Sequence, residues 1–90
     1  MEIIIHRVNS IRKLNILPTR YGVEIDVRSY RSNLILNHEP KNSGDKLYDY
    51  LGRYKNGTII FNIKEAGIEY EVINLAKKFK IKSFFLLDVE

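Results

Sequence analysis

Residues 22–29, with the sequence GVEIDVRS, decide the fold that this chain is expected to adopt. Valine and isoleucine occupy every second position, which is typical of a β-strand with a buried face. Side chains two residues apart share a face of a strand, so Glu24 and Asp26 point the same way. Two carboxylates set among apolar residues are costly to bury without a cation or hydrogen-bond donors. The stretch predicts either a strand that carries a functional site or an edge strand whose charges face water.

Apolar runs outside this stretch predict alternating strands and helices. Four runs rich in β-branched or aromatic residues are expected to be strands: 2–8, 22–29, 58–64 and 83–89. A short extended run at 33–37 could fold back on the second strand. Helical spacing predicts helices over about 45–54 and 67–79. A shorter helical segment is expected before Pro18, which ends it. The alternation indicates one α/β domain over residues 1–90, with a parallel sheet of about four strands and βα repeats.

The composition describes a small, moderately basic protein. Its 90 residues, 44% of them hydrophobic, suffice for one domain near the lower end of self-sufficient size. The absence of cysteine excludes disulfides and thiolate metal sites and fits a cytoplasmic location. The apolar run at residues 3–5 is too short for a secretory signal, and no run approaches the ~20 residues of a membrane span. The net charge is +4. The cluster of lysines within residues 77–82 is expected to be a solvated helix end rather than a nucleic-acid patch.

Polar residues recur near the carboxyl ends of the expected strands. They are His6, Asp26, Asn62, Lys64 and Asp88. In parallel α/β folds this end of the sheet is where ligands bind, both in barrels and in open sheets. The distribution therefore predicts a common site at one end of the sheet.

Four short motifs occur in a fixed order along the chain. Residues 5–8 read IHRV, residues 23–27 read VEIDV, residues 37–40 read NHEP and residues 61–64 read FNIK. This order resembles the N-terminal half of the glycerophosphodiester phosphodiesterase family, which belongs with the phosphatidylinositol-specific phospholipases C. The resemblance implies a fold equivalent to the first half of a (β/α)8 barrel, whose complete form runs about 250 residues.

The resemblance also implies a role for each matching residue. The three roles are acid–base catalysis by His6 and His38, metal binding by Glu24, Asp26 and Asn62, and phosphate binding by Arg7 and Lys64. Oxygen ligands without sulfur favour Mg²⁺ or Ca²⁺, and histidine ordinarily titrates near neutrality. The implied reaction is cleavage of a small phosphodiester by a hydroxyl of its own alcohol, followed by attack of water.

Two positions depart from the family pattern. Val8 replaces a glycine, and Asn62 stands where a third carboxylate is usual, which lowers the charge offered to a cation. Four strands do not close into a barrel, so their open edges are expected to pair with a second copy of the chain. The alternative to an enzyme is a catalytically inactive, truncated relative that serves as a structural or interaction module. Nucleic-acid binding is a weaker third interpretation, because the chain has no recognised binding motif.

Overall fold

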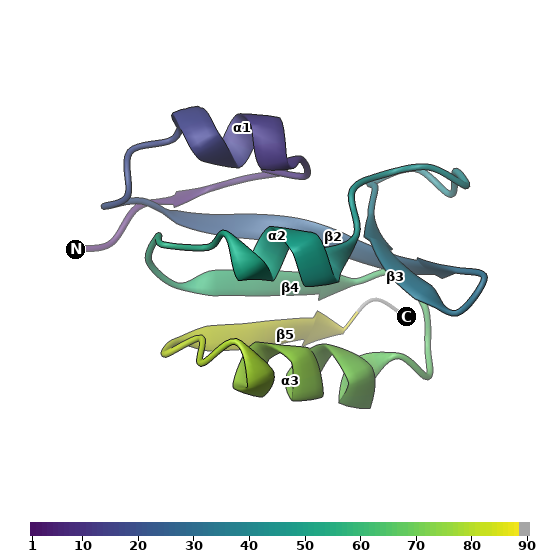
Figure 1. The fold of residues 1–90 in the computed structure, drawn as a ribbon. Helices are drawn as coiled ribbons and strands as arrows, with labels where there is room; N and C mark the ends of the chain where they lie inside the picture. The colour runs from purple at the N-terminus through teal and green to yellow at the C-terminus, as the bar shows by residue number, and fades with distance from the viewer. Residues whose placement is uncertain (89–90) are drawn as a thin grey trace.

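A computed structural model, which describes residues 1–88, confirms an α/β fold built on a mostly parallel sheet (Figure 1). The strands are β1 (Ile4–Ile5), β2 (Gly22–Tyr30), β3 (Asn33–Leu36), β4 (Ile59–Ile63) and β5 (Phe84–Asp88). The helices are α1 (Ile11–Ile16), α2 (Leu47–Gly52) and α3 (Glu69–Lys78). The strand order is β1-β2-β4-β5, all parallel, and β3 pairs antiparallel with β2. Residue 89, the expected end of the last strand, lies outside the described residues.

The first strand is shorter than the sequence predicts. A strand over residues 2–8 is expected, but only two residues pair with β2. The chain turns at Arg7, whose φ of +56° lies in the left-handed region. Beyond that turn β3 lies beside β2 on the same edge, because Val27 pairs both with Leu36 of β3 and with Ile63 of β4. The extended run that could fold back on the second strand is therefore a short fifth strand of the sheet.

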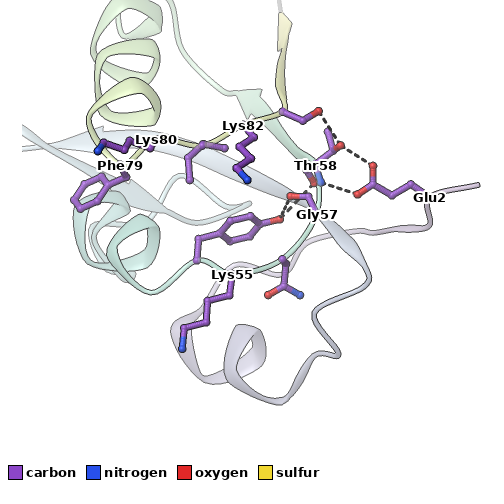
Figure 2. A pocket seen from close by; sticks show the side chains of 11 residues that line it. Glu2, Lys55, Gly57, Thr58, Phe79, Lys80 and Lys82 are labelled. Carbon is purple, nitrogen blue, oxygen red and sulfur yellow. Dashed lines mark hydrogen bonds between the residues drawn. The ribbon is translucent and has the colours of Figure 1, made fainter.

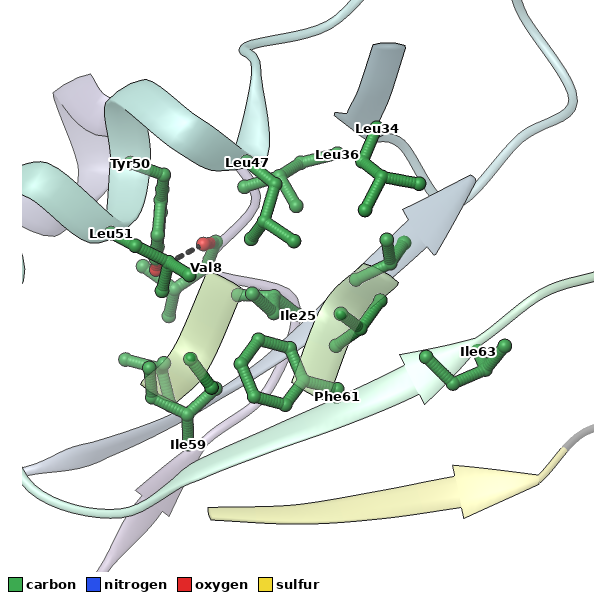
Figure 3. Close-up of a cluster of buried hydrophobic side chains, with 14 of the residues drawn as sticks. Val8, Ile25, Leu34, Leu36, Leu47, Tyr50, Leu51, Ile59, Phe61 and Ile63 are labelled. Carbon is green, nitrogen blue, oxygen red and sulfur yellow. Dashed lines mark hydrogen bonds between the residues drawn. The ribbon is translucent and has the colours of Figure 1, made fainter. Parts of the chain in front are cut away.

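One face of the sheet is covered by all three helices. Odd-numbered side chains of β2 and β4 share a buried cluster with residues of α1, α2 and α3: Val23, Ile25, Val27, Ile59, Phe61, Ile63, Leu14, Leu47, Tyr50, Leu51, Val72 and Ala76. Figure 3 shows part of this cluster, with side chains of α2 on one side and those of β4 on the other. Even-numbered residues of β2 and β4 point to the opposite face, and so do Phe85 and Leu87, the partners of Ile60 and Asn62 on β5, which are 62% and 46% exposed. No helix of the described chain covers that second face.

Tyr50 of α2 is completely buried and donates a hydrogen bond of 2.7 Å to the carbonyl oxygen of Val8 (Figure 3). Burial raises the pKa of Tyr50 and of Tyr54 above the ordinary value, and Glu2 adds to the effect at Tyr54. The folded pKa therefore exceeds the unfolded value of about 10. The stability that depends on the protonated phenols is fully present below this pH and is lost as the pH rises above it.

We expect the free energy of unfolding to fall by about 1.4 kcal/mol per pH unit above pH ~10 for each buried tyrosine. Urea denaturation across this range, on the native protein and on Tyr50→Phe, measures the slope. Other groups titrate equally in both proteins, so the difference between the slopes isolates Tyr50. The variant should lose stability less steeply, and identical slopes would contradict the buried phenol.

The carboxyl end of α3 carries a strained lysine. Lys80 has a φ of +57°, and the amides of Lys80 and Ile81 donate to the carbonyl oxygens of Lys77 and Ala76. This hydrogen-bond pattern is the Schellman motif, in which the left-handed position favours glycine. Lys80→Gly should therefore raise the free energy of unfolding by about 1 kcal/mol. Thermal denaturation measures the gain, and Lys82→Gly, at a position without positive φ, is the control that should show none.

Candidate functional site at the carboxyl end of the sheet

Two carboxylates of β2 lie on the face that no helix covers, and each lies next to one histidine. Nδ1 of His6 is 3.6 Å from Oε1 of Glu24, and Nδ1 of His38 is 3.6 Å from Oδ2 of Asp26. Nζ of Lys64, just after β4, is 3.6 Å from Oδ1 of Asp26. The alternative of solvated acids on an edge strand is wrong, because β2 is interior to the sheet and Asp26 is only 1% exposed.

Asp26 is the most constrained group of this cluster. β1 pairs with β2 only as far as Val23, so no part of β1 lies beside Asp26. The side chain of Asn9 bonds to Asp26 in its place. Oδ1 of Asn9 accepts from the backbone amide of Asp26 at 2.9 Å, and Nδ2 donates to Oδ2 of Asp26 at 2.9 Å. The other carboxylate oxygen of Asp26, Oδ1, faces the ammonium group of Lys64. A buried carboxylate needs such donors and a nearby cation, and here the fold supplies both.

Asn62 of β4 lies beside Asp26, since the two are register partners and their side chains share a face. Its Oδ1 is buried and has no hydrogen-bond partner within the described part of the chain. A buried acceptor without a donor requires an explanation, and a hard cation bound by carboxylate and amide oxygens would provide one. Residues 1–88 contain no group of three His, Cys, Asp or Glu side chains able to hold a metal. The amide oxygen of Asn62 would thus have to complete an oxygen set with Glu24 and Asp26, and that donor set suits Mg²⁺ or Ca²⁺.

His38 lies in the loop that follows β3, and Arg28 of β2 holds this loop in place. Nε of Arg28 donates to the carbonyl oxygen of Asn37 at 3.1 Å, and Nη2 donates to that of His38 at 2.8 Å. Nδ2 of Asn37 donates in turn to the carbonyl oxygen of Ser43 at 2.8 Å, which closes the loop. The β2–β3 hairpin therefore holds the backbone of His38 next to Asp26. Nδ1 of His38 is buried and has no hydrogen-bond partner among the described residues.

His6 and Arg7 form the exposed side of the cluster. The side chain of His6 is 76% exposed, and Arg7 is exposed as well. Arg7 pairs with none of the carboxylates that the structure describes, so it does not neutralise Glu24 or Asp26. Its left-handed backbone is a strain of the kind that concentrates at functional sites. Asp88 ends β5, but its side chain is outside the described part of the chain.

Sequence reasoning missed Asn9 and Arg28. Arg28 lies two residues beyond Asp26, so the two-residue period of the strand places it on the same face and could have indicated it. Asn9 follows the turn at Arg7, and no periodicity relates it to Asp26. A cleft of about 340 Å³ opens beside the cluster, and Arg7, Asn9 and His38 are among its lining residues.

A separate cavity of about 440 Å³ lies at the opposite, amino-terminal end of the strands (Figure 2). Glu2 folds onto Thr58 there and accepts hydrogen bonds from its amide at 2.7 Å and its hydroxyl at 2.6 Å. These bonds lower the pKa of the Glu2 carboxyl. The hydroxyl of Thr58 also lies 3.0 Å from that of Ser83, so the cluster joins the start of the chain to β4 and β5. The carboxylate of Glu2 already accepts two hydrogen bonds from Thr58. We therefore assign a stabilising role to this end of the sheet.

Comparison of the chain with family models, with curated proteins and with solved structures finds no match in any of the three. Within residues 1–88, none of the helices is long and apolar enough to cross a membrane.

Proposed function

We propose that this chain is a metal-assisted phosphodiester hydrolase of the glycerophosphodiester phosphodiesterase type. The observation that carries the proposal is the buried carboxylate of Asp26, which lies 3.6 Å from both an imidazole and an ammonium group. Glu24 and His6 extend the same cluster toward solvent. Acidic, basic and cationic groups gathered at the carboxyl end of parallel strands are typical of catalytic sites in α/β proteins.

The proposal includes a fold equivalent to the first half of a (β/α)8 barrel. The support is that β1, β2, β4 and β5 are parallel and adjacent in chain order, with helices on one face. The uncovered face would then correspond to the interior of a barrel. In such folds the site residues lie at the carboxyl ends of the strands. The antiparallel β3 would be an addition to this plan.

In this proposal Glu24, Asp26 and Asn62 hold Mg²⁺ or Ca²⁺. When bound, the cation would neutralise charge that develops on the non-bridging oxygens of the phosphodiester. Lys64 and Arg7 would contact the same oxygens, since Lys64 carries a nearly buried ammonium group and Arg7 carries an exposed guanidinium at the rim that pairs with no described carboxylate.

The two histidines would move the protons. His6 takes the proton from a neighbouring hydroxyl of the substrate as that oxygen bonds to phosphorus. His38 gives a proton to the leaving alcohol oxygen as its bond to phosphorus breaks. The roles then reverse: water loses a proton to His38, its oxygen bonds to phosphorus, and the cyclic ester opens with protonation by His6. Arg28 would keep His38 in place over Asp26 through both steps.

Turnover of glycerophosphocholine and of a cyclic phosphodiester, with Mg²⁺ or Ca²⁺ and with a chelator, tests the proposal. We expect hydrolysis that requires the cation and that is lost in His6→Ala and in Glu24→Gln. Activity that is unaffected by either substitution would remove the proposal.

A second candidate function, a non-catalytic interaction module, rests on the uncovered face. Phe85 and Leu87 are exposed there, and β5 pairs only with β4 among the described strands. An apolar edge strand beside an exposed aromatic ring favours pairing with another chain. We propose that a second copy pairs at this edge. Sedimentation tests it, because a well-folded monomer at tens of micromolar would contradict the pairing.

A further inference from the structure

The cleft beside His38 lies between the loop that follows β1 and the loop that follows β3. Arg7 and His38 belong to the proposed active site, and Asn9 holds the buried Asp26. A phosphodiester placed between His38 and Lys64 would therefore have one of its substituents next to this cleft. The chemistry of the cleft wall then bears on which substituent the site accepts.

The charged side chains on the wall of the cleft, Arg7 and Lys13, are both basic. Arg7 and Lys13 are exposed, and neither forms an ion pair with the carboxylates that the structure describes. The remaining lining residues are the imidazole of His38 and four uncharged side chains: Asn9, Ser10, Leu36 and Asn37. Neither a carboxylate nor the ring of a Phe, Tyr or Trp is among the lining residues. A quaternary ammonium group would thus find none of the partners that usually bind it.

The backbone that carries Lys13 is held in place. Oγ of Ser10 accepts from the amide of Lys13 at 3.1 Å and caps the first turn of α1. Oδ2 of Asp45 accepts from the amide of Ile11 at 2.6 Å, which ties the same turn to the segment before α2. Lys13 is therefore presented to the cleft from an anchored turn, and its ammonium group forms no ion pair with a carboxylate that the structure describes.

We propose that the cleft binds a second anionic group of the substrate, a phosphate or carboxylate on the alcohol that the diester releases, with Lys13 as the residue that selects for it. The inference rests on the proposed function for the position of the reacting phosphate. Arg7 would lie between this group and the reacting phosphate, whereas Lys13 pairs with no carboxylate of the described residues and would attract an anion and repel a cationic alcohol.

Phosphoglycolate and phosphocholine are suitable probes, because both carry a phosphate ester on a two-carbon unit and differ in the sign of the second charge. Their affinities, measured by amide shift titration at one ionic strength, should differ by about tenfold in favour of phosphoglycolate. Lys13→Gln should bring the two affinities to within about threefold of each other. Arg12→Gln is the matched control, since it removes the same charge from the same helix outside the cleft and should keep the preference.

Equal affinities in the native protein would overturn the inference, as would the absence of binding by both probes. Equal effects of Lys13→Gln and Arg12→Gln would also overturn it, because only net charge would then be at work. Turnover measured on the same samples separates the two claims. Cation-dependent hydrolysis without a Lys13-dependent preference overturns the inference alone, whereas the preference without hydrolysis supports the anion cleft and removes the enzyme.

Discussion

Asp26→Asn is expected to lower kcat/KM for cation-dependent phosphodiester hydrolysis by about a thousandfold. Asparagine has the shape of the native side chain and can still accept the hydrogen bond from Asn9, so the local backbone should persist. The charge is lost, however, and with it the partner of both Lys64 and His38 and, under the proposed function, an anionic ligand of the cation. Leaving Lys64 without its carboxylate should also cost about 1–3 kcal/mol of folding free energy.

Steady-state kinetics with saturating Mg²⁺ or Ca²⁺ measure this loss, and far-ultraviolet circular dichroism verifies that the variant is folded. Asp49→Asn is the matched control, because Asp49 is exposed on α2 and lies on the helical side of the sheet. It should leave both turnover and stability unchanged. Turnover of Asp26→Asn within a few fold of the native protein would exclude Asp26 from the active site.

Phe61→Ala should have the largest effect on stability, a loss of about 3–5 kcal/mol. Phe61 is completely buried in β4 and meets the ring of Phe84 edge to face, with 5.8 Å between centroids. Small domains have only about 5–15 kcal/mol of stability in total, so the melting temperature should fall by about 20 °C. Urea denaturation followed by circular dichroism measures the free energy of unfolding.

Phe85→Ala is the matched control for this second prediction. Phe85 lies on the neighbouring strand and belongs to the opposite face, where it is 62% exposed. Its removal should cost less than about 1 kcal/mol in the monomer. An equal loss for both variants would contradict the assignment of the two faces, and a loss at Phe85 that grows with protein concentration would support pairing of two copies.

The alternation in residues 22–29 predicted the strand and the common face of Glu24 and Asp26, because the two-residue period follows from backbone geometry alone. The length of β1 was not predictable in the same way. Three consecutive isoleucines are typical of a buried strand, yet pairing also requires a free edge on β2. β3 occupies that edge from Val27 onward, and the left-handed turn at Arg7 ends β1 before it reaches that point; nothing in residues 2–8 indicates either feature.

The proximity of several candidate residues was predictable from the sequence, but the groups that hold them in place were not. His6, Glu24, Asp26, His38 and Lys64 come together as the order of motifs predicts. Their positions depend on Asn9 and Arg28, which act through hydrogen bonds across turns of the chain, and turn geometry is not a periodic property of the sequence. The bound metal and the reaction stay predictions for the experiments above.

The most direct measurement of the central claim is a titration of the isotope-labelled protein with Mg²⁺ or Ca²⁺, followed through its backbone amide shifts. The account predicts saturable shifts centred on Glu24, Asp26 and Asn62, and their disappearance in Asp26→Asn. Shifts that are scattered over surface acids such as Glu69 and Glu71, or that persist unchanged in the variant, would contradict it.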